Sequence, residues 1–403
     1  MIGFMSQPAP RIQGVERRAP PSTAVAIAGG GVIGLSLAYE LARRGQEVVV
    51  LERHHAGAGA GGVAAGMLAP ASEAEHASDA LVRLAQDSLR LYPEWVRGVQ
   101  AASGLDCGLR REGTLLVALG QDDESELARI ARFQDRYDVP TVWLTAQQVL
   151  DREPQLSPRV TGGLHAPDDW QVDPQSMLRA LAQAVVRLGG HVVEGATVDG
   201  FHRAGGRLAH VSGTYAAGDA ATATSGEPFT LRCQAAVLAA GAWSGLEMHW
   251  PAGPLGVRPV KGQLLHLRGP ELIAHVVRTP QVYLVPRAGG TLVVGATMEE
   301  MGFDGEPTAG ATMDLLWSAR LALPGVYDLA LADVRVGFRP ATRDHEPLIG
   351  ETSVPGLFVA TGHFRHGVLL APATAVLLAE QLTGGSPAPA LAPFAPRPAL
   401  VRT

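Results

Sequence analysis

Hydrophobic positions near the amino terminus form two short runs on either side of a helical pattern. The runs at 24–28 and 47–51 are typical of buried strands. Between them, apolar residues recur over 35–42 at the spacing of one helix face, and Gly45 ends the pattern. The pattern therefore predicts a strand–helix–strand unit of the kind that builds a parallel sheet.

Farther along, helical and strand patterns continue to alternate, which favours an α/β architecture. Asp173 can cap a helix whose first position is Pro174 and whose end is marked by Gly189. Residues 212–228 are rich in Gly, Ala, Ser and Thr and are expected to form a loop insertion. The spacing of apolar residues also predicts helices at 78–101, 122–137, 145–151 and 311–322. It predicts strands at 191–194, 197–202, 258–268 and 281–297.

Composition narrows the class of protein. The 403 residues suffice for two or three domains, and 46% hydrophobic with 18% charged residues excludes wholesale disorder. A net charge of −6 and a pI near 6.1 leave no basic surface for a phosphate backbone, so we expect no nucleic-acid partner. Lys261 is the single lysine beside 32 arginines, a bias that by itself indicates no function.

The two cysteines and the lack of a long apolar run further limit the class of protein and its location. Cys107 and Cys233 show no CxxC spacing, so we expect packed thiols rather than a disulfide, metal or redox site. No apolar run approaches the roughly 20 residues that span a bilayer, so we expect a cytoplasmic protein without a membrane partner. Residues 1–22 contain four prolines and are expected to form a flexible tail.

The sharpest local signal is the sequence GGGVIG at 29–34. Gly29 allows a tight turn, Gly31 lets backbone amides approach a diphosphate, and Gly34 lets the helix pack closely on the strand. Glu52 follows the second strand, 18 residues after Gly34, where a carboxylate can bind an adenosine ribose. Against the alternative of a purely structural turn, the motif predicts dinucleotide binding, but it does not separate NAD from FAD.

Two further glycine-containing segments are suited to the same ligand. Residues 56–66 are almost all Gly and Ala, which suits close approach of the backbone to a second part of an extended cofactor, although a mobile loop is the alternative. Near the carboxyl terminus, a strand at 357–361 leads into the loop 362–371 and a helix expected to begin near Pro372. That helix start would direct several amides and a helix dipole at one anionic group.

Seven motifs follow one another along the chain: GGGVIG at 29–34, AAGMLAP at 64–70, PVKGQLL at 259–265, YLVPR at 283–287, LVVGATME at 292–299, GFRPATRD at 337–344 and GHFRHGVLLAPAT at 362–374. Together they resemble the FAD-dependent D-amino acid oxidase superfamily and, within it, the glycine oxidases of bacterial thiazole (thiamine) biosynthesis. The resemblance covers residues 24 to about 383.

The resemblance implies a Rossmann-like FAD-binding domain assembled from discontinuous segments and an α+β substrate domain with an antiparallel sheet. The expected FAD-binding segments are 23–78, 160–248 and 333–385, and the expected substrate-domain segments are 79–159 and 249–332. A carboxyl-terminal tail is expected at 386–403.

The resemblance also implies which residues hold FAD. Those expected around the diphosphate and the adenosine are Gly29, Gly31, Val32, Ile33, Gly34, Glu52, Arg53, Ala60, Gly61 and Val198. Of these, Ala60 and Gly61 stand where the family often has Thr or Ser, so hydroxyl contacts to the diphosphate would be absent. Those expected along the flavin are Ala65, Gly66, Met67, Gly241, His363, Phe364, Arg365, His366, Gly367, Val368 and Leu369. Relatives with covalently attached FAD use a cysteine near the GFRP segment, and none occurs there, so non-covalent FAD is implied.

On the substrate side, Arg339 matches the arginine that forms a bidentate pair with an amino-acid carboxylate, against the alternative of a surface arginine. Tyr283 matches a tyrosine whose hydroxyl reaches the same carboxylate, and otherwise would be a core aromatic. Arg365 and Met298 are expected at the mouth and wall of the pocket, with surface and core-filling roles as their alternatives. Gln281 stands where the best-known members have histidine.

The activity implied by the resemblance is oxidative deamination of glycine, with sarcosine or small D-amino acids as further substrates. Hydride transfer to flavin would give glyoxylate and ammonia, and dioxygen would give hydrogen peroxide. No catalytic acid or base and no metal is expected, because the protein mainly positions the substrate. The family commonly forms homo-oligomers, which we expect here. The alternatives are an amine or D-amino acid dehydrogenase with another electron acceptor, and a dinucleotide-binding module without activity.

Overall fold

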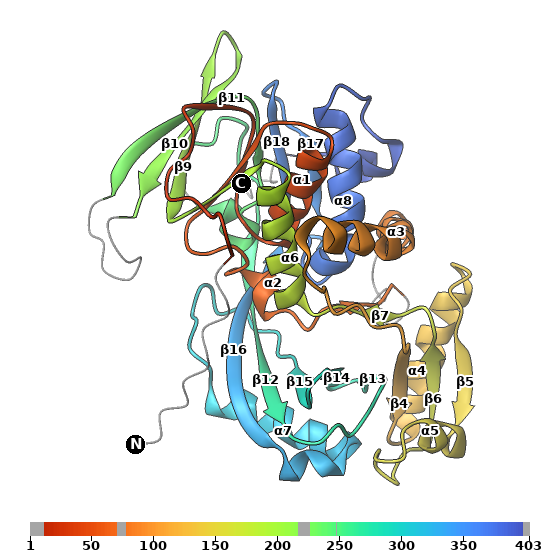
Figure 1. Ribbon diagram of the computed structural model, residues 1–403. Helices are drawn as coiled ribbons and strands as arrows, with labels where there is room; N and C mark the ends of the chain where they lie inside the picture. The colour runs from red at the N-terminus through yellow and green to blue at the C-terminus, as the bar shows by residue number, and fades with distance from the viewer. Residues whose placement is uncertain (1–11, 71–77, 217–225, 247, 398–403) are drawn as a thin grey trace, which may run out of the picture.

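The computed structural model describes residues 12–70, 78–216, 226–246 and 248–397. Within these residues the chain forms two large sheets, one above the other in Figure 1, with helices packed against each. We refer to them as the upper and the lower sheet. The mixed α/β architecture that the sequence predicts is confirmed.

The upper sheet contains the parallel strands of the fold. Its central strand β1 (Ser22–Ala28) pairs in parallel with β2 (Val48–Glu52) on one side and β11 (Glu227–Leu238) on the other. Beyond these lie β8 (His191–Glu194), β18 (Leu357–Thr361) and β17 (Leu348–Glu351), and β9 (Ala196–Ala204) and β10 (Arg207–Tyr215) extend β11 in antiparallel fashion. Because β1, β2 and β11 run in parallel, their carboxyl ends meet at one edge, where open α/β sheets bind ligands.

Four helices pack together beside this sheet: α1 (Val32–Arg43), α3 (Asp79–Ser103), α6 (Pro174–Arg187) and α8 (Gly367–Leu382). They share one hydrophobic core with β1 and β2, in which Ile27, Leu35 and Tyr92 are fully buried. The strand–helix–strand unit at 24–51 and the helix that begins at Pro174 are confirmed.

The lower sheet is antiparallel except where β13 pairs with β4. Its order is β16 (Ala330–Ala341), β12 (Arg258–Arg268), β15 (Thr291–Gly295), β14 (Tyr283–Arg287), β13 (Val276–Arg278), β4 (Thr114–Ala118), β6 (Gly162–Ala166) and β5 (Val142–Thr145). Helix α7 (Ala309–Ala322) packs against β12 and β15, while α4 (Gln121–Asp135) and α5 (Ala146–Arg152) pack near β4, β5 and β6. Shorter elements are α2 (Ala60–Val63), β3 (Met67–Leu68), β7 (Trp170–Gln171), η1 (Gly241–Gly245), η2 (Pro324–Asp328) and η3 (Pro389–Phe394).

Three elements lie in the other half of the molecule from the one that the expected domain boundaries assign them. Helix α3 belongs to the upper core, although 79–159 is expected in the substrate domain, because its buried apolar face packs on α6 and α8. Strands β6 and β16 join the lower sheet, although 160–248 and 333–385 are expected in the FAD-binding domain, because they hydrogen bond to β4 and β12.

The described parts of the two expected tails, near Glu16 and at 389–394, pack against the fold, while residues 1–11 and 398–403 lie outside the described ranges. Glu16 donates its N–H to the Val192 carbonyl at 2.9 Å and accepts from the Glu194 N–H at 3.1 Å, so residues near it add to the edge strand β8. At the other end, Phe394 of η3 is fully buried in the upper core. The expected loop at 212–228 is also shorter, since β10 and β11 extend into it; residues 217–225 lie outside the described ranges.

Helix α8 begins at Gly367, five residues before the start expected near Pro372. A proline inside a helix leaves the carbonyl four residues earlier without its usual N–H donor. Here the Tyr92 hydroxyl, on α3, donates to that carbonyl, of Val368, at 2.5 Å. Because the neighbouring helix supplies a donor, α8 continues through the proline.

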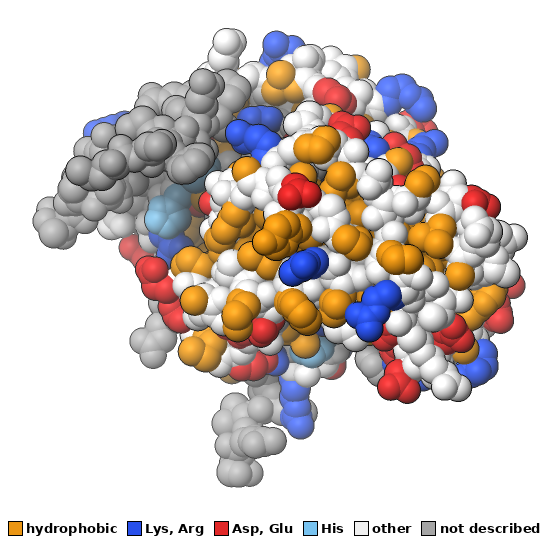
Figure 2. Space-filling model, turned by 90° about the horizontal axis from the view of Figure 1, so that it is seen from below, with side chains coloured by type: hydrophobic (Ala, Val, Ile, Leu, Met, Phe, Trp, Pro, Cys, Tyr) orange, Lys and Arg blue, Asp and Glu red, His pale blue; other side chains and the backbone are white. Residues whose placement is uncertain are grey.

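Exposed apolar side chains gather on α7 and the segment after it. Met313, Trp317 and Tyr327 are 66%, 60% and 72% exposed, and Figure 2 shows many hydrophobic side chains on the face seen from below. In the described ranges, no helix combines the length and the apolar character that crossing a bilayer requires. Cys107 and Cys233 are free and buried, as the sequence predicts.

Candidate functional site

A cavity of about 550 Å³ lies at the carboxyl ends of β1, β2 and β11. Its wall combines residues of the upper sheet, such as Ala28 and Leu238, with residues of the lower sheet, such as Gly262 and Leu264. The cavity is therefore lined by both halves of the molecule, at the edge where the parallel strands end.

The glycine turn at 29–34 has the geometry that its sequence predicts. Gly29 has φ +116°, which L side chains rarely adopt. A Cβ at Gly34 would lie 1.9 Å from the Gly29 carbonyl oxygen, so only glycine lets α1 begin this close to β1. A Cβ at Gly31 would meet no protein atom within 4 Å. The open space beside Gly31, at the amino end of α1, is suited to a diphosphate that accepts backbone N–H bonds.

Glu52 ends β2 with its carboxylate fixed beside this turn. Its Oε2 accepts the Gly30 N–H at 2.7 Å, and its Oε1 accepts the His54 N–H at 2.9 Å. Each carboxylate oxygen keeps a further lone pair with which it can accept a ribose hydroxyl. Next to Glu52, the guanidinium of Arg53 lies over the ring of Trp243, 4.9 Å from its centroid.

The small-residue segment 56–66 includes the short helix α2 and packs closely on its neighbours rather than forming an open loop. A Cβ at Gly66 would lie 2.1 Å from the Val172 carbonyl oxygen, so a larger residue does not fit. The Ala65 carbonyl accepts a hydrogen bond from the Arg287 guanidinium. Burial lowers the pKa of Arg287 to about 10, which leaves it charged at neutral pH.

The turn before α8 forms the carboxyl-terminal wall of the cavity. The Nε2 of the buried His363 lies 3.2 Å from the Thr374 hydroxyl oxygen, and burial lowers the pKa of His363 to about 3, so the ring is neutral at pH 7. Phe364 has φ +48° and stacks on His345 with 4.2 Å between ring centroids. Helix α8 then begins at Gly367, which lines the cavity. The helix start expected near Pro372 therefore lies at Gly367 instead.

The residues expected to bind the substrate come together on the lower-sheet side. Arg339 donates from Nη1 to the Thr297 carbonyl at 3.0 Å and lines the cavity rather than the outer surface. Tyr283 packs against Gly295, where an added Cβ would lie 2.5 Å from its ring. The Nη2 of Arg365 lies 3.1 Å from the Met298 sulfur.

Most residues predicted to hold the cofactor or the substrate line this one cavity. They are Gly29, Gly31, Val32, Ile33, Glu52, Arg53, Ala60, Gly61, Ala65, Gly66, Met67, Val198, Gly241, Tyr283, Met298, Arg339, His363, Phe364, Arg365, Gly367 and Val368. Gly34, His366 and Leu369 are not among the lining residues. Gly34 packs under the turn, His366 precedes α8 as its buried N-cap, and Leu369 turns into the upper core.

Sequence reasoning missed several lining residues, among them Arg278, Trp243 and Thr297. Arg278 pairs with Tyr283 across β13 and β14. The register of that hairpin is the one signal that could have predicted a second guanidinium beside the tyrosine. Trp243 follows the glycine turn after β11, where no residue pattern separates a ligand contact from core packing.

The parallel sheet carries a glycine turn and an acidic residue after its second strand, and the antiparallel sheet presents a guanidinium to the same cavity. These features are typical of a dinucleotide-binding enzyme. The sequence matches the family described as FAD dependent oxidoreductase over residues 24–381, and the chain belongs to that family. The cofactor is therefore FAD. The open space beside Gly31, the carboxylate of Glu52 and the small-residue wall at 56–66 all fit this group.

Two curated relatives and one solved structure are similar over almost the whole chain. The chain is 36% identical over 376 residues to "Bifunctional protein ThiO/ThiG" of Nostoc sp., which covers 92% of this chain and 54% of that protein. It is 35% identical over 374 residues to a glycine oxidase of Geobacillus kaustophilus, covering 92% and 95%. The crystal structure of glycine oxidase from Geobacillus kaustophilus has a TM-score of 0.86 and 33% identity, covering 95% of this chain and 100% of that chain. The chain thus spans about half the length of the bifunctional relative.

Proposed function

We propose that the protein oxidises glycine to glyoxylate and ammonia, with dioxygen as electron acceptor and hydrogen peroxide as second product. The observation that carries this proposal is the place of Arg339, a guanidinium in the wall of the same cavity that Gly31 and Glu52 line. The similarity to glycine oxidases at 35% identity supports glycine as the substrate.

Arg339 would bind the substrate carboxylate. A guanidinium offers parallel N–H donors that match a carboxylate, and the bond from Nη1 to Thr297 leaves Nη2 and Nε for that contact. The Tyr283 hydroxyl would donate to the same carboxylate, since Tyr283 lines the cavity beside Arg278. Held at its carboxylate, a small amino acid keeps its α-carbon in one place, which lowers the entropy cost of reaction.

FAD, when bound, supplies the hydride acceptor and the reaction with dioxygen. The protein's own part is to orient the substrate and to stabilise charge. The backbone N–H groups at the start of α8 lie at Gly367 in the cavity wall and favour negative charge there. The neutral ring of His363 adds no positive charge to compete with the substrate amine.

The test is anaerobic addition of glycine to the FAD-loaded protein. We expect the absorbance band of oxidised flavin to fall, and admission of air to restore it with release of one hydrogen peroxide per glyoxylate. Reoxidation that is slow in air but fast with a quinone would instead identify a dehydrogenase. A flavin that glycine, sarcosine and D-alanine all fail to reduce would contradict the proposal.

We propose thiazole (thiamine) biosynthesis as the setting of this reaction, supported by the similarity to the bifunctional ThiO/ThiG protein. The expected result is that loss of the gene creates a growth requirement that the thiazole moiety relieves. Growth without thiazole would contradict this setting and would leave the oxidation of glycine itself unaffected.

We also propose a homo-oligomer. The exposed apolar side chains of α7, including Met313 and Trp317, support this association, because large exposed apolar patches are typical of interfaces. Sedimentation velocity should show a particle larger than one chain, and Trp317→Glu should shift it toward the monomer. A monomer for both proteins would contradict the proposal.

A further inference from the structure

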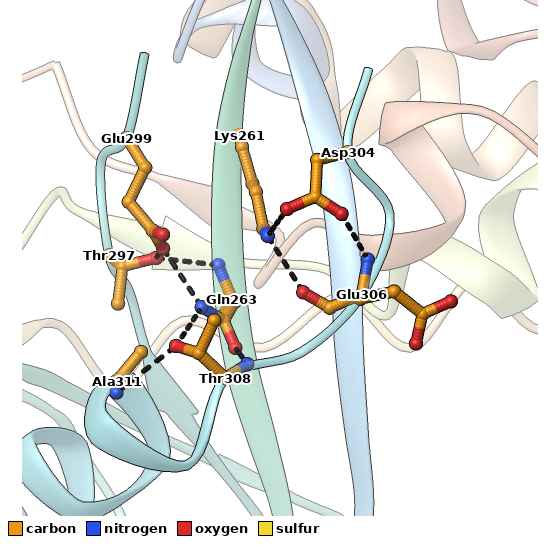
Figure 3. A network of polar contacts seen from close by, with 8 residues as sticks. All are labelled: Lys261, Gln263, Thr297, Glu299, Asp304, Glu306, Thr308 and Ala311. Atoms are coloured by element: carbon orange, nitrogen blue, oxygen red, sulfur yellow. Dashed lines mark hydrogen bonds and ion pairs between the residues drawn. The ribbon is translucent and has the colours of Figure 1, made fainter. Parts of the chain in front are cut away.

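The segment 296–308 connects β15 to α7 and passes beside β12 (Figure 3). Its first residues, Ala296, Thr297 and Met298, line the cavity, while its last residue, Thr308, caps α7. Two side chains of β12, Lys261 and Gln263, contact this segment and are fully buried. The path of the segment past the cavity therefore depends on buried polar contacts to β12.

Lys261 holds the middle of the segment. Its N–H donates to the Glu299 carbonyl at 2.9 Å, and its Nζ donates to Asp304 Oδ2 at 3.0 Å and to the Glu306 carbonyl at 2.7 Å. A buried ammonium needs such partners, because an unpaired charge in the interior is costly. The ammonium and these acceptors therefore keep the segment on β12.

Gln263 and Glu299 hold the start of the segment through Thr297. The Thr297 hydroxyl accepts the Gln263 N–H at 2.9 Å and donates to the Glu299 carboxylate, which also accepts Gln263 Nε2 at 2.9 Å. Burial raises the pKa of Glu299, but the hydrogen bonds from Thr297 and Gln263 lower it overall, so the acceptor stays ionised. The Thr297 N–H donates to the Gln263 carbonyl at 3.2 Å, which fixes the residue from both sides.

The carbonyl of Thr297 reaches the substrate side of the sheet. It accepts Arg339 Nη1 at 3.0 Å, and in the described part of the chain it is the only hydrogen-bonding partner of that guanidinium. Side chains alternate along β12, so Lys261 and Gln263 leave one face while Gly262 lies on the other. An added Cβ at Gly262 would lie 2.4 Å from Arg339 Nη1, so the guanidinium passes close over this glycine.

We propose that Thr297 is a positioning residue for Arg339. Its hydroxyl, held by Gln263 and Glu299, fixes the direction of its carbonyl, and the carbonyl orients the guanidinium so that the remaining donors face the substrate. The inference rests on the proposed carboxylate-binding role of Arg339. A bidentate pair needs two parallel bonds, so a small tilt of the guanidinium weakens it.

The test compares FAD-loaded wild-type protein with Thr297→Val, which keeps the carbonyl and the shape but removes the hydroxyl. The matched control is Thr312→Val on α7, whose hydroxyl donates to the Thr308 carbonyl at 3.0 Å. One measurement is the dissociation constant of acetate, an unreactive carboxylate, from the change in the flavin spectrum; the other is kcat and KM for glycine. We expect Thr297→Val to weaken acetate binding and raise KM about tenfold with kcat changed less than about threefold, because the hydroxyl's two hydrogen bonds, from the Gln263 N–H and to Glu299, are lost. Thr312→Val should match wild type, and Thr297→Ser should restore tight binding.

A double-mutant cycle shows whether the effect passes through Arg339. In an Arg339→Lys background, which keeps the charge but not the fork, Thr297→Val should cause little further loss of acetate affinity. The same tenfold loss in both backgrounds, or wild-type acetate binding in Thr297→Val, would overturn the inference. Glu299→Ala removes the acceptor of the Thr297 hydroxyl and gives the same test if Thr297→Val does not retain FAD. Acetate binding needs no turnover, so absence of glycine oxidation would contradict the proposed function and not this inference.

Discussion

At the residue scale, Arg339 is the side chain on which the proposed chemistry depends most. Replacing it with Ala removes the two charge-assisted hydrogen bonds that we propose it donates to the substrate carboxylate. Together these contribute about 3 kcal/mol, so kcat/KM for glycine should fall about a hundredfold. FAD content should stay as in wild type, because Gly31 and Glu52, which we propose to contact FAD, are untouched. Steady-state kinetics on flavin-matched samples measure this.

The matched control for that variant lies on the same strand. Arg335 pairs with Asp333 at 2.7 Å and is not part of the cavity wall, so Arg335→Ala should leave kcat/KM near the wild-type value. An unchanged kcat/KM in Arg339→Ala, or equal losses in both variants, would argue against a carboxylate-binding role for Arg339.

His266 of β12 predicts a pH dependence of stability. Burial, and next the charge of Arg335, lower the pKa of His266 to about 4 in the folded protein, against about 6.5 for an exposed histidine. Between about pH 4 and pH 6.5 the unfolded chain binds a proton on this histidine that the folded chain does not. The contribution of the neutral His266 to the free energy of unfolding is therefore complete above about pH 6.5 and is lost as the pH falls toward 4. Between pH 7.5 and 5.5, His266→Gln should therefore lose about 1 kcal/mol less stability than wild type. Urea unfolding at the two pH values measures the difference, and parallel losses would refute it.

Single residues were predictable from the sequence where a local pattern fixes their geometry. Gly31 and Glu52 stand at set positions around a strand–helix–strand unit, and the structure places both at the cavity. Thr297 and Arg278 carry no such pattern. Arg278 stands beside Tyr283 through the register of the β13–β14 hairpin, and Thr297 reaches Arg339 only because the connection after β15 hydrogen bonds to β12. Contacts of that kind depend on register, which hydrophobic periodicity alone does not determine.

At the scale of elements, the junction of β1 and α1 offers a paired test of two glycines. Gly34→Ala places a methyl group 1.9 Å from the Gly29 carbonyl oxygen, so we expect a loss of roughly 3 kcal/mol or more in the free energy of unfolding. Gly31→Ala meets no protein atom within 4 Å and should leave the FAD-free protein as stable as wild type, yet weaken FAD binding at least about tenfold, because the methyl group enters the space for the diphosphate. Calorimetry of FAD-free protein and flavin titration separate the two effects. Equal stability losses in both variants would contradict the separate roles given to Gly34 in packing and to Gly31 in FAD binding.

Element boundaries were predictable except where a distant element changes the local rule. Pro372 suggests a helix start from sequence alone, but the Tyr92 hydroxyl serves the carbonyl that the proline leaves without a donor. That hydroxyl lies about 280 residues away in the chain and has no signature near the proline. The helix start, and with it the amides at the cavity wall, therefore shifts to Gly367.

At the scale of the whole molecule, the cavity joins parts of the chain that are far apart in sequence. Its wall includes residues of 28–67, 196–199, 238–248 and 360–368. FAD held in this cavity would bind only the folded state, so an FAD concentration 100 times the dissociation constant should add about 2.7 kcal/mol to stability. Calorimetry with increasing FAD should show a rising midpoint. An unfolding midpoint that does not change as FAD binds would mean that the cofactor does not bridge these segments.

The allocation of elements to the two halves was the least predictable feature. β16 follows the substrate-domain segments in sequence, hydrogen bonds to β12 along its whole length, and carries Arg339. α3 has a strong amphipathic pattern, but the pattern does not say against which core its apolar face packs. Because the chain passes between the sheets repeatedly, boundaries drawn from motif order misplace elements that lie at the crossings.

Because of Lys261, the folded chain should react unusually slowly with reagents that acylate lysine amines. It is the single lysine in 403 residues, and its side chain has no exposed surface. Such a reagent can reach that ε-amine only while Asp304 and Glu306 are separated from it. The rate of acylation, followed as one added mass on one peptide, would therefore measure how often this region opens, with no signal from any other lysine.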